Sequence, residues 1–339
     1  MSILNVGGKI FSVTQFESPR PGVVYLAELE QDEKGQLTTK RIKPVDQSAS
    51  GGVWIPCAGM VTPWQTHLGS EEYEPNARSY YEDSGVISGN NLNNIHAFMR
   101  YFNRYENKTT FTRAVAQAGG FYPYRYGYPW ETVVKSDFTE TTTKLYVHGR
   151  MAYEMSYVMP DEKTVFGTDD GTNVMFHKFV ATNAKNLREG KNYCAKYTQT
   201  SAAGADAKDW AADVEWIEMP TPTEAEVKAA VESTTWSDLF DTEACNSDGT
   251  CPSTGFKSVN TGGFGCECLK VKTGKEKLAA VFEKRRYAGT VLLLKYIDPQ
   301  RQRVVWLSRW LFWFNLYAVC RLPRVHNRVQ EVGGHHLQP

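Results

Sequence analysis

The chain has 339 residues, 41% of them hydrophobic and 22% charged, so it can bury a sizeable core and has an ordinary globular composition. Lys and Arg number 38, as do Asp and Glu, and this zero net charge gives no electrostatic support for a nucleic-acid or membrane partner. Aromatic residues make up 13% of the chain. Because Tyr and Trp favour half-buried strand surfaces, we expect a mainly β fold.

Strand patterns dominate residues 8–220. β-Branched and aromatic residues concentrate in six runs, at 22–30, 51–60, 142–159, 163–182, 191–200 and 213–220. Turn residues separate several of these runs. Short strands with regular turns are typical of a sandwich, a barrel or a propeller, and no clean sequence repeat chooses among the three.

Three segments have helical patterns, at 91–106, 222–233 and 273–286. In the first, apolar residues recur at helical spacing. The second begins with Thr223 and Glu226, the signature of a capping box.

One hydrophobic run, at 304–320, raises the question of a membrane helix. Arg309 interrupts it, and the apolar part that follows is about half of the roughly 20 residues that a span needs, so we expect no membrane helix. The first residues, MSILNVGGKIF, lack the basic region and long apolar core of a signal peptide. The sequence therefore leaves the localisation open.

Four of the seven cysteines, Cys245, Cys251, Cys266 and Cys268, lie close together in the chain. Their separations differ from the paired spacing of most structural zinc sites. Zinc, one or two disulfides, and unpaired thiols remain open for them, and export from the cell would favour disulfides. Cys57 lies far from every other cysteine and fits a buried thiol, a nucleophile or a metal ligand.

Two adjacent carboxylates, Glu71 and Glu72, follow Cys57 in the sequence WIPCAGMVTPWQTHLGSEEYEPN. Because neighbouring residues on a strand point to opposite faces, one of the two at most can face a given pocket unless the chain turns there. A solvated polar turn is the alternative interpretation. The chain contains no P-loop, no Gly-x-Ser-x-Gly elbow and no His-Glu-x-x-His motif, so several common enzyme classes are unexpected.

Further charged residues occur in HGRMAYE, residues 148–154, where an extended chain would place Arg150 and Glu154 on one face. Such a pair can flank a metal-bound anion or form an ordinary cross-strand ion pair. Asp169 and Asp170 precede a glycine, and this acidic turn suits calcium or a turn without any ligand.

Taken together, these segments resemble the PhoX-type alkaline phosphatases. PCAGMVTPWQTHLGSEE is similar to the family's block of Cys-Ala-Gly, Thr-Pro-Trp and Glu-Glu, and YPYRYGYPWE, HGRMAYE and TVFGTDDGTNVMFHKFV resemble the segments that follow it. The resemblance covers roughly residues 20–220.

The resemblance implies a six-bladed β-propeller that hydrolyses small-molecule phosphate monoesters with ferric iron (Fe3+) and calcium (Ca2+). It implies Cys57 and Glu154 as iron ligands. Glu71, Glu72, Asp169 and Asp170 become candidates for calcium or for shaping the site, and Arg150 becomes a candidate clamp for a phosphate oxygen. We expect a monomer, and the family's export suggests an extracellular or periplasmic location.

The chain departs from the family pattern at several positions. Tyr153 stands where the family has His, Ser70 replaces a second Cys, and the later Arg-Pro-Glu motif is missing. We therefore expect a partial propeller domain over 1–289 and an atypical tail over 290–339, with an impaired metal site. A non-catalytic calcium-binding or interaction propeller is the alternative.

Overall fold

Four antiparallel sheets and seven short α-helices make up the part of the chain that the computed structural model describes, namely residues 1–17, 22–82, 87, 89–101, 111–171, 174–260 and 265–291. The prediction of a mainly β protein is confirmed. Most of the expected atypical tail, together with the hydrophobic run at 304–320, lies outside these residues. None of the helices among them is long and apolar enough to span a membrane.

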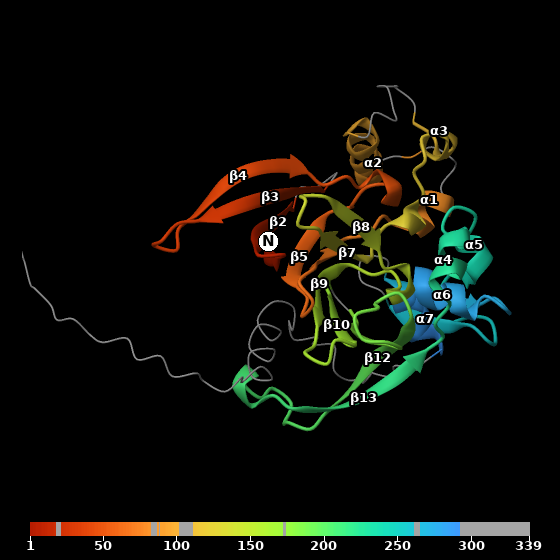
Figure 1. The fold of residues 1–339 in the computed structure, drawn as a ribbon. Helices are drawn as coiled ribbons and strands as arrows, with labels where there is room; N and C mark the ends of the chain where they lie inside the picture. The colour runs from red at the N-terminus through yellow and green to blue at the C-terminus, as the bar shows by residue number, and fades with distance from the viewer. Residues whose placement is uncertain are drawn as a thin grey trace, which may run out of the picture.

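The first three sheets each join strands that follow one another in the chain (Figure 1). The first sheet contains β1 (Ser2–Val6), β2 (Lys9–Phe16), β3 (Val23–Gln31) and β4 (Leu37–Pro44). The second contains β5 (Pro56–Val61), β6 (His67–Glu71), β7 (Pro129–Val134) and β8 (Glu140–Lys144). The third contains β9 (Tyr153–Val158), β10 (Thr164–Asp169), β11 (Phe176–Ala181), β12 (Gly190–Gln199) and β13 (Ala212–Met219).

Local sequence explains the tightest of these hairpins. Val6 pairs with Lys9, and the two residues between them, Gly7 and Gly8, both have positive φ, at 59° and 76°. A two-residue turn of this kind needs positive φ at both positions, which glycine adopts at low cost. The glycine pair therefore sets the register of β1 against β2.

Apolar side chains join neighbouring sheets. One buried cluster, which includes Phe11, Leu26 and Trp130, lies between the first and second sheets. Another, which includes Leu68 and Phe179, lies between the second and third. β1 and β2 contact β5, and β5 and β6 contact β9, so the first strands of successive sheets lie next to one another.

The fourth sheet is smaller, and the helices pack around it and beside the second sheet. Its strands lie in the order β14 (Phe240–Glu243), β16 (Cys266–Val271), β15 (Lys257–Asn260). The helices are α1 (Ala77–Glu82), α2 (Gly89–Tyr101), α3 (Arg113–Ala118), α4 (Glu224–Ala230), α5 (Trp236–Leu239), α6 (Glu276–Phe282) and α7 (Lys284–Val291). Figure 1 shows α4 to α7 gathered on one side of the sheets.

The helix predictions are confirmed with one correction. The capping box expected at Thr223 is present, because its hydroxyl accepts from the Glu226 N–H and the Glu226 carboxylate accepts from the Thr223 N–H. The helix expected at 91–106 is α2, and residues 102–106 lie outside the described part. The single helix expected over 273–286 is wrong: α6 and α7 are separate, since Glu283 leaves the helical conformation at φ −133° and ψ 52°.

Two disulfides, Cys245–Cys266 and Cys251–Cys268, resolve the alternatives that the sequence left open for these cysteines. They tie β16 to the segment that follows β14. Among the described cysteines, Cys57 and Cys194 are free thiols.

Candidate metal centre

Three potential ligands from two sheets meet at one point. The Cys57 thiol and one carboxylate oxygen each of Glu17 and Glu72 all lie within 4.8 Å of one another. Glu17 directly follows β2 in the first sheet. Cys57 lies on β5, and Glu72 directly follows β6, both in the second sheet.

Local distortions of the chain bring these side chains together. The pairing of β5 with β6 shifts between Pro56 and Gly59, and this β-bulge falls on Cys57. A bulge re-aims a side chain relative to the regular pleat. On the other strand, Tyr73 has a positive φ of 47°, so the chain turns directly after Glu72.

Two carboxylates of the third sheet, Glu154 and Asp170, act electrostatically on two of these three potential ligands. Glu154 lies on β9, and its charge contributes to the raised pKa of both Cys57 and Glu72. Asp170 directly follows β10, and its charge is the strongest electrostatic influence that raises the pKa of Glu72. The Tyr73 hydroxyl donates a hydrogen bond to Asp170. We call Glu17, Cys57, Glu72, Glu154 and Asp170 the acidic cluster.

Burial, together with the neighbouring negative charges, favours the protonated forms of Cys57 and Glu72. Burial, followed by the charges of Glu72, Glu17 and Glu154, raises the pKa of Cys57 to about 12. Burial and Asp170 raise the pKa of Glu72 to about 7, although its hydrogen bond with the thiol acts in the opposite direction. A bound cation would take the place of these protons, since metal ligands must be deprotonated. One soft sulfur beside several hard oxygens fits a mixed site for iron and calcium.

Glu71 lies apart from the acidic cluster, in the protein interior. Its carboxylate forms an ion pair of 2.8 Å with Lys144, and both side chains are fully buried. It also accepts from the backbone N–H groups of Trp54 at 2.7 Å, Gly127 at 2.8 Å and Tyr128 at 3.0 Å. These contacts hold β6 against the segment before β7. Of the adjacent pair, Glu72 is therefore the one that faces the cluster.

Asp169 is also engaged by the backbone. Its two carboxylate oxygens accept from the N–H groups of Ala152 and Met175, each at 3.1 Å. Arg285 lies 3.7 Å away, and burial raises the pKa of Asp169 to about 7. Asp169 thus fixes the loop that carries its neighbour Asp170.

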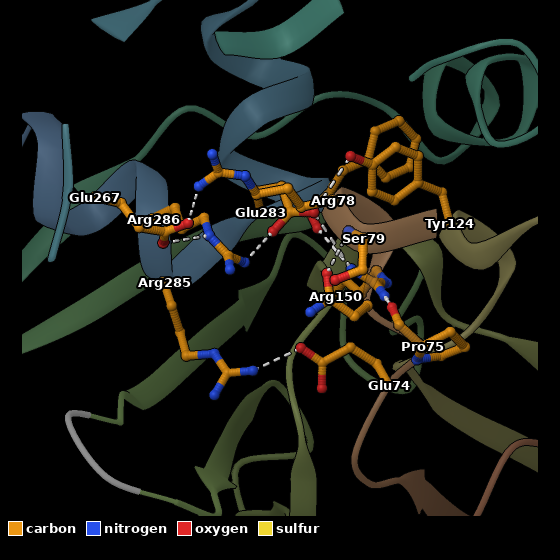
Figure 2. A network of polar contacts seen from close by, with 12 residues as sticks. Glu74, Pro75, Arg78, Ser79, Tyr124, Arg150, Glu267, Glu283, Arg285 and Arg286 are labelled. Carbon is orange, nitrogen blue, oxygen red and sulfur yellow. Dashed lines mark hydrogen bonds and ion pairs between the residues drawn. The ribbon is translucent and has the colours of Figure 1, made fainter. Parts of the chain in front are cut away.

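Arg150 is buried among backbone carbonyls, and Figure 2 shows its contact with Pro75. Its guanidinium donates to Tyr126 at 2.8 Å, to Phe282 at 3.3 Å and to Pro75, and it lies 3.6 Å from Glu283. The extended chain expected for HGRMAYE is wrong at its start. Residues 146–148 form a 3-10 turn and Gly149 has a positive φ of 76°, so Arg150 precedes β9 and does not share a strand face with Glu154.

The network in Figure 2 also contains the first residues of α7. Arg285 pairs with Glu74 at 2.6 Å, and Arg286 pairs with Glu267 at 3.0 Å and Glu283 at 2.8 Å. Glu267 stands between the two disulfide-bonded cysteines of β16. The network therefore ties α7 both to the fourth sheet and to the chain just beyond Glu72.

Glu17 is the member of the acidic cluster that sequence reasoning missed. It falls in QFESPRP, which matches no motif, and its neighbours in the cluster come from a different sheet. The available signal was a carboxylate directly after a strand. That signal is too common to single out one residue.

Comparison with known proteins assigns the chain to a family. Residues 34–255, more than half of the chain, match the family described as Alkaline phosphatase PhoX. The match includes every member of the acidic cluster except Glu17. No curated protein and no solved structure matches the chain. The chain belongs to the PhoX alkaline phosphatase family.

Proposed function

We propose that this chain hydrolyses phosphate monoesters at the acidic cluster, which would hold iron and calcium. The observation that carries the proposal is the convergence of Cys57 with Glu17 and Glu72 within 4.8 Å, on segments that belong to two different sheets. Cys57 and Glu154 are the proposed iron ligands. Glu17, Glu72 and Asp170 supply hard oxygens of the kind that calcium prefers.

The contribution of the bound cations is electrostatic. Together they would neutralise a phosphate dianion and stabilise the charge that builds up during an in-line displacement. The protein residues hold the ligands in place: the bulge at Cys57 aims the thiol, and Tyr73 holds Asp170. Arg150 and Glu71 have structural roles in this proposal, because each is engaged within the interior.

The overall architecture that we propose is a propeller over residues 1–289. Each of the first three sheets is an antiparallel meander, and the first strands of successive sheets are neighbours, as in adjacent blades. The family's propeller has six blades, so this chain would provide part of one. For 290–339 we propose that the atypical tail arises from an altered reading frame or a retained intron, and sequencing the transcript across codon 289 tests this. A spliced message encoding the same tail would contradict it.

The proposed substrates are small phosphate monoesters, acted on by a monomer. An oxidising compartment, outside the cytoplasm, fits the two disulfides.

Metal analysis with a paired activity assay tests the function. Purified protein should contain iron and calcium and hydrolyse p-nitrophenyl phosphate, and Cys57→Ser should lose iron and activity together. Cys194→Ser is the matched control, because Cys194 is the other free thiol in the described part and lies buried outside the cluster. Equal metal content and turnover in Cys57→Ser and Cys194→Ser would refute the site.

A non-catalytic calcium-binding propeller is the second candidate. It is favoured by Arg150, the residue that the sequence suggested as a phosphate clamp, whose donors are engaged by backbone carbonyls. Bound calcium without iron and without turnover would support this candidate over the enzyme.

A further inference from the structure

A chain of side-chain hydrogen bonds runs from β1 to the backbone of Cys57. The Ser2 hydroxyl lies 2.7 Å from Nδ1 of His67, and Nε2 of His67 lies 2.9 Å from Oε1 of Gln15. The Gln15 amide nitrogen then donates to the carbonyl oxygen of Cys57. Four strands take part, since Ser2, Gln15, Cys57 and His67 lie on β1, β2, β5 and β6.

The direction of every hydrogen bond in this chain is fixed. The Cys57 carbonyl can only accept, so the Gln15 amide presents its nitrogen there and its oxygen to His67. Nε2 of His67 must then carry the proton, and Nδ1 accepts from Ser2. Burial lowers the pKa of His67 to about 3, so the ring stays neutral and keeps this tautomer. Hydrogen bonds that run in one direction polarise and strengthen one another.

Two glycines make room for the Gln15 amide. Gly59 and Gly69 face each other across β5 and β6. A Cβ at Gly59 would lie 2.6 Å from Cε1 of His67 and 3.0 Å from Oε1 of Gln15. A Cβ at Gly69 would lie 2.7 Å from the same oxygen and 2.2 Å from the Trp130 ring. The amide thus occupies a space between the first two sheets that side chains at these positions would fill.

The hydrogen bond from Gln15 to Cys57 lies where the regular pairing of β5 with β6 is interrupted. The bulge between Pro56 and Gly59 takes Cys57 out of the regular pairing with β6. The Gln15 amide supplies a donor to the Cys57 carbonyl at this place. Gln15 also lies two residues before Glu17, so the same hydrogen bond links the strand end that carries Glu17 to the strand that carries the thiol.

We propose that Gln15, held by His67 and Ser2, is a positioning residue that sets the Cys57 thiol and Glu17 at the distance a shared cation needs. The proposal rests on the proposed function of the acidic cluster. Residues that orient metal ligands through hydrogen bonds typically change metal affinity by about 10- to 100-fold when replaced.

The test compares Gln15→Leu with Asn192→Leu. Asn192 makes the same kind of bridge in the third sheet: its oxygen lies 2.7 Å from Nε2 of His177, and its nitrogen donates to the Val147 carbonyl at 2.7 Å. Both variants leave a histidine and a carbonyl without the amide, so both should lose stability. Only Gln15→Leu should weaken metal binding, by about 10- to 100-fold.

Metal binding is measured by titrating metal-free protein with Co2+, whose bond to a thiolate gives a charge-transfer absorption band. Gln15→Leu should shift the titration to higher Co2+ and weaken the band per bound ion, whereas Asn192→Leu should match wild type. Gln15→Glu is the second variant. It keeps an oxygen for His67 and removes the donor to Cys57, so it should behave like Gln15→Leu if the Cys57 contact matters.

Failure of this proposal can be told from failure of the proposed function. If the wild type shows no thiolate band, Cys57 is not a metal ligand and the proposed function is wrong. The positioning role is then read from the alkylation rate of Cys57 at one fixed pH, followed by peptide mass spectrometry. A changed rate in both Gln15 variants, with the wild-type rate in Asn192→Leu, supports the positioning role. Wild-type titration, band and alkylation rate in both Gln15 variants would overturn it.

Discussion

The adjacent residues Glu71 and Glu72 should respond in opposite ways to the same substitution. In metal-free protein, Glu71→Gln should lower the free energy of unfolding, because it leaves the buried charge of Lys144 without its partner. Removing one member of a buried ion pair costs about 3–5 kcal/mol. A single amide oxygen also cannot serve all three backbone donors, and each orphaned donor adds about 1–3 kcal/mol.

Deprotonation of Lys144 limits this loss, since burial already lowers the pKa of that side chain. A domain of this kind has about 5–15 kcal/mol of stability in total, so a loss of 3–5 kcal/mol is easily measured. The double variant Glu71→Gln with Lys144→Met should recover much of it, because no charge is then left unpaired.

Glu72→Gln should instead stabilise metal-free protein at about pH 8. The folded state raises the pKa of Glu72 from 4.5 to about 7, so the fold binds the proton more tightly than the unfolded chain, and ionisation above this range costs stability. The shift sets an upper limit of about 3 kcal/mol, which solvent screening reduces. Bound iron and calcium should fall in Glu72→Gln and persist in Glu71→Gln.

Urea unfolding followed by Trp fluorescence gives the two free energies, and elemental analysis gives the metal content. Loss of metal from folded Glu71→Gln, or destabilisation of metal-free Glu72→Gln, would show that the roles of the two residues are assigned wrongly.

Three further substitutions test other parts of the structure. Cys251→Ser removes a cross-link over 17 residues and should lower the unfolding free energy by about 3 kcal/mol in urea, while the same variant under reducing conditions should match reduced wild type. Burial lowers the pKa of His148 to about 3, so between about pH 6 and pH 5 only the unfolded chain binds a proton at this residue, and the fold loses stability. In His148→Phe this loss over the same pH range should be smaller by about 1 kcal/mol, and an unchanged pH dependence would contradict the reasoning. Glu17→Gln should weaken calcium binding in equilibrium dialysis without a change in melting temperature, since Glu17 is exposed.

The strands and helix starts were predictable because local patterns determine them. Runs of β-branched and aromatic residues predicted strands at 22–30 and 213–220, which correspond to β3 (Val23–Gln31) and β13 (Ala212–Met219). The Thr223 capping box predicted the start of α4. The break within the strand-like run at 142–159 could not be predicted from its composition. Its composition is that of a strand throughout, but Gly149 turns the chain, so β9 begins only at Tyr153.

The site could be predicted in part. Cys57 and Glu72 stood in one segment that resembled a known family, and they lie together. The separate roles of Glu71 and Arg150 could not be predicted, because they depend on Lys144 and on carbonyls far away in sequence. A sequence pattern gives the residue type and the spacing, whereas the partner of a buried charge is decided by how the sheets pack.

The meander order of the sheets has a consequence for how the protein folds. Within each of the first three sheets the paired strands are consecutive in the chain, so most strand pairings require the closure of short loops and can proceed as the chain is synthesised. The pairing of β6 with β7 is the exception, because residues 72–128 separate these two strands. The acidic cluster, by contrast, spans residues from Glu17 to Asp170, and three sheets must dock before it exists. Interactions that form only after the transition state slow unfolding and leave the folding rate almost unchanged. Metal bound there should therefore act on the lifetime of the native protein, with little effect on the speed at which it forms.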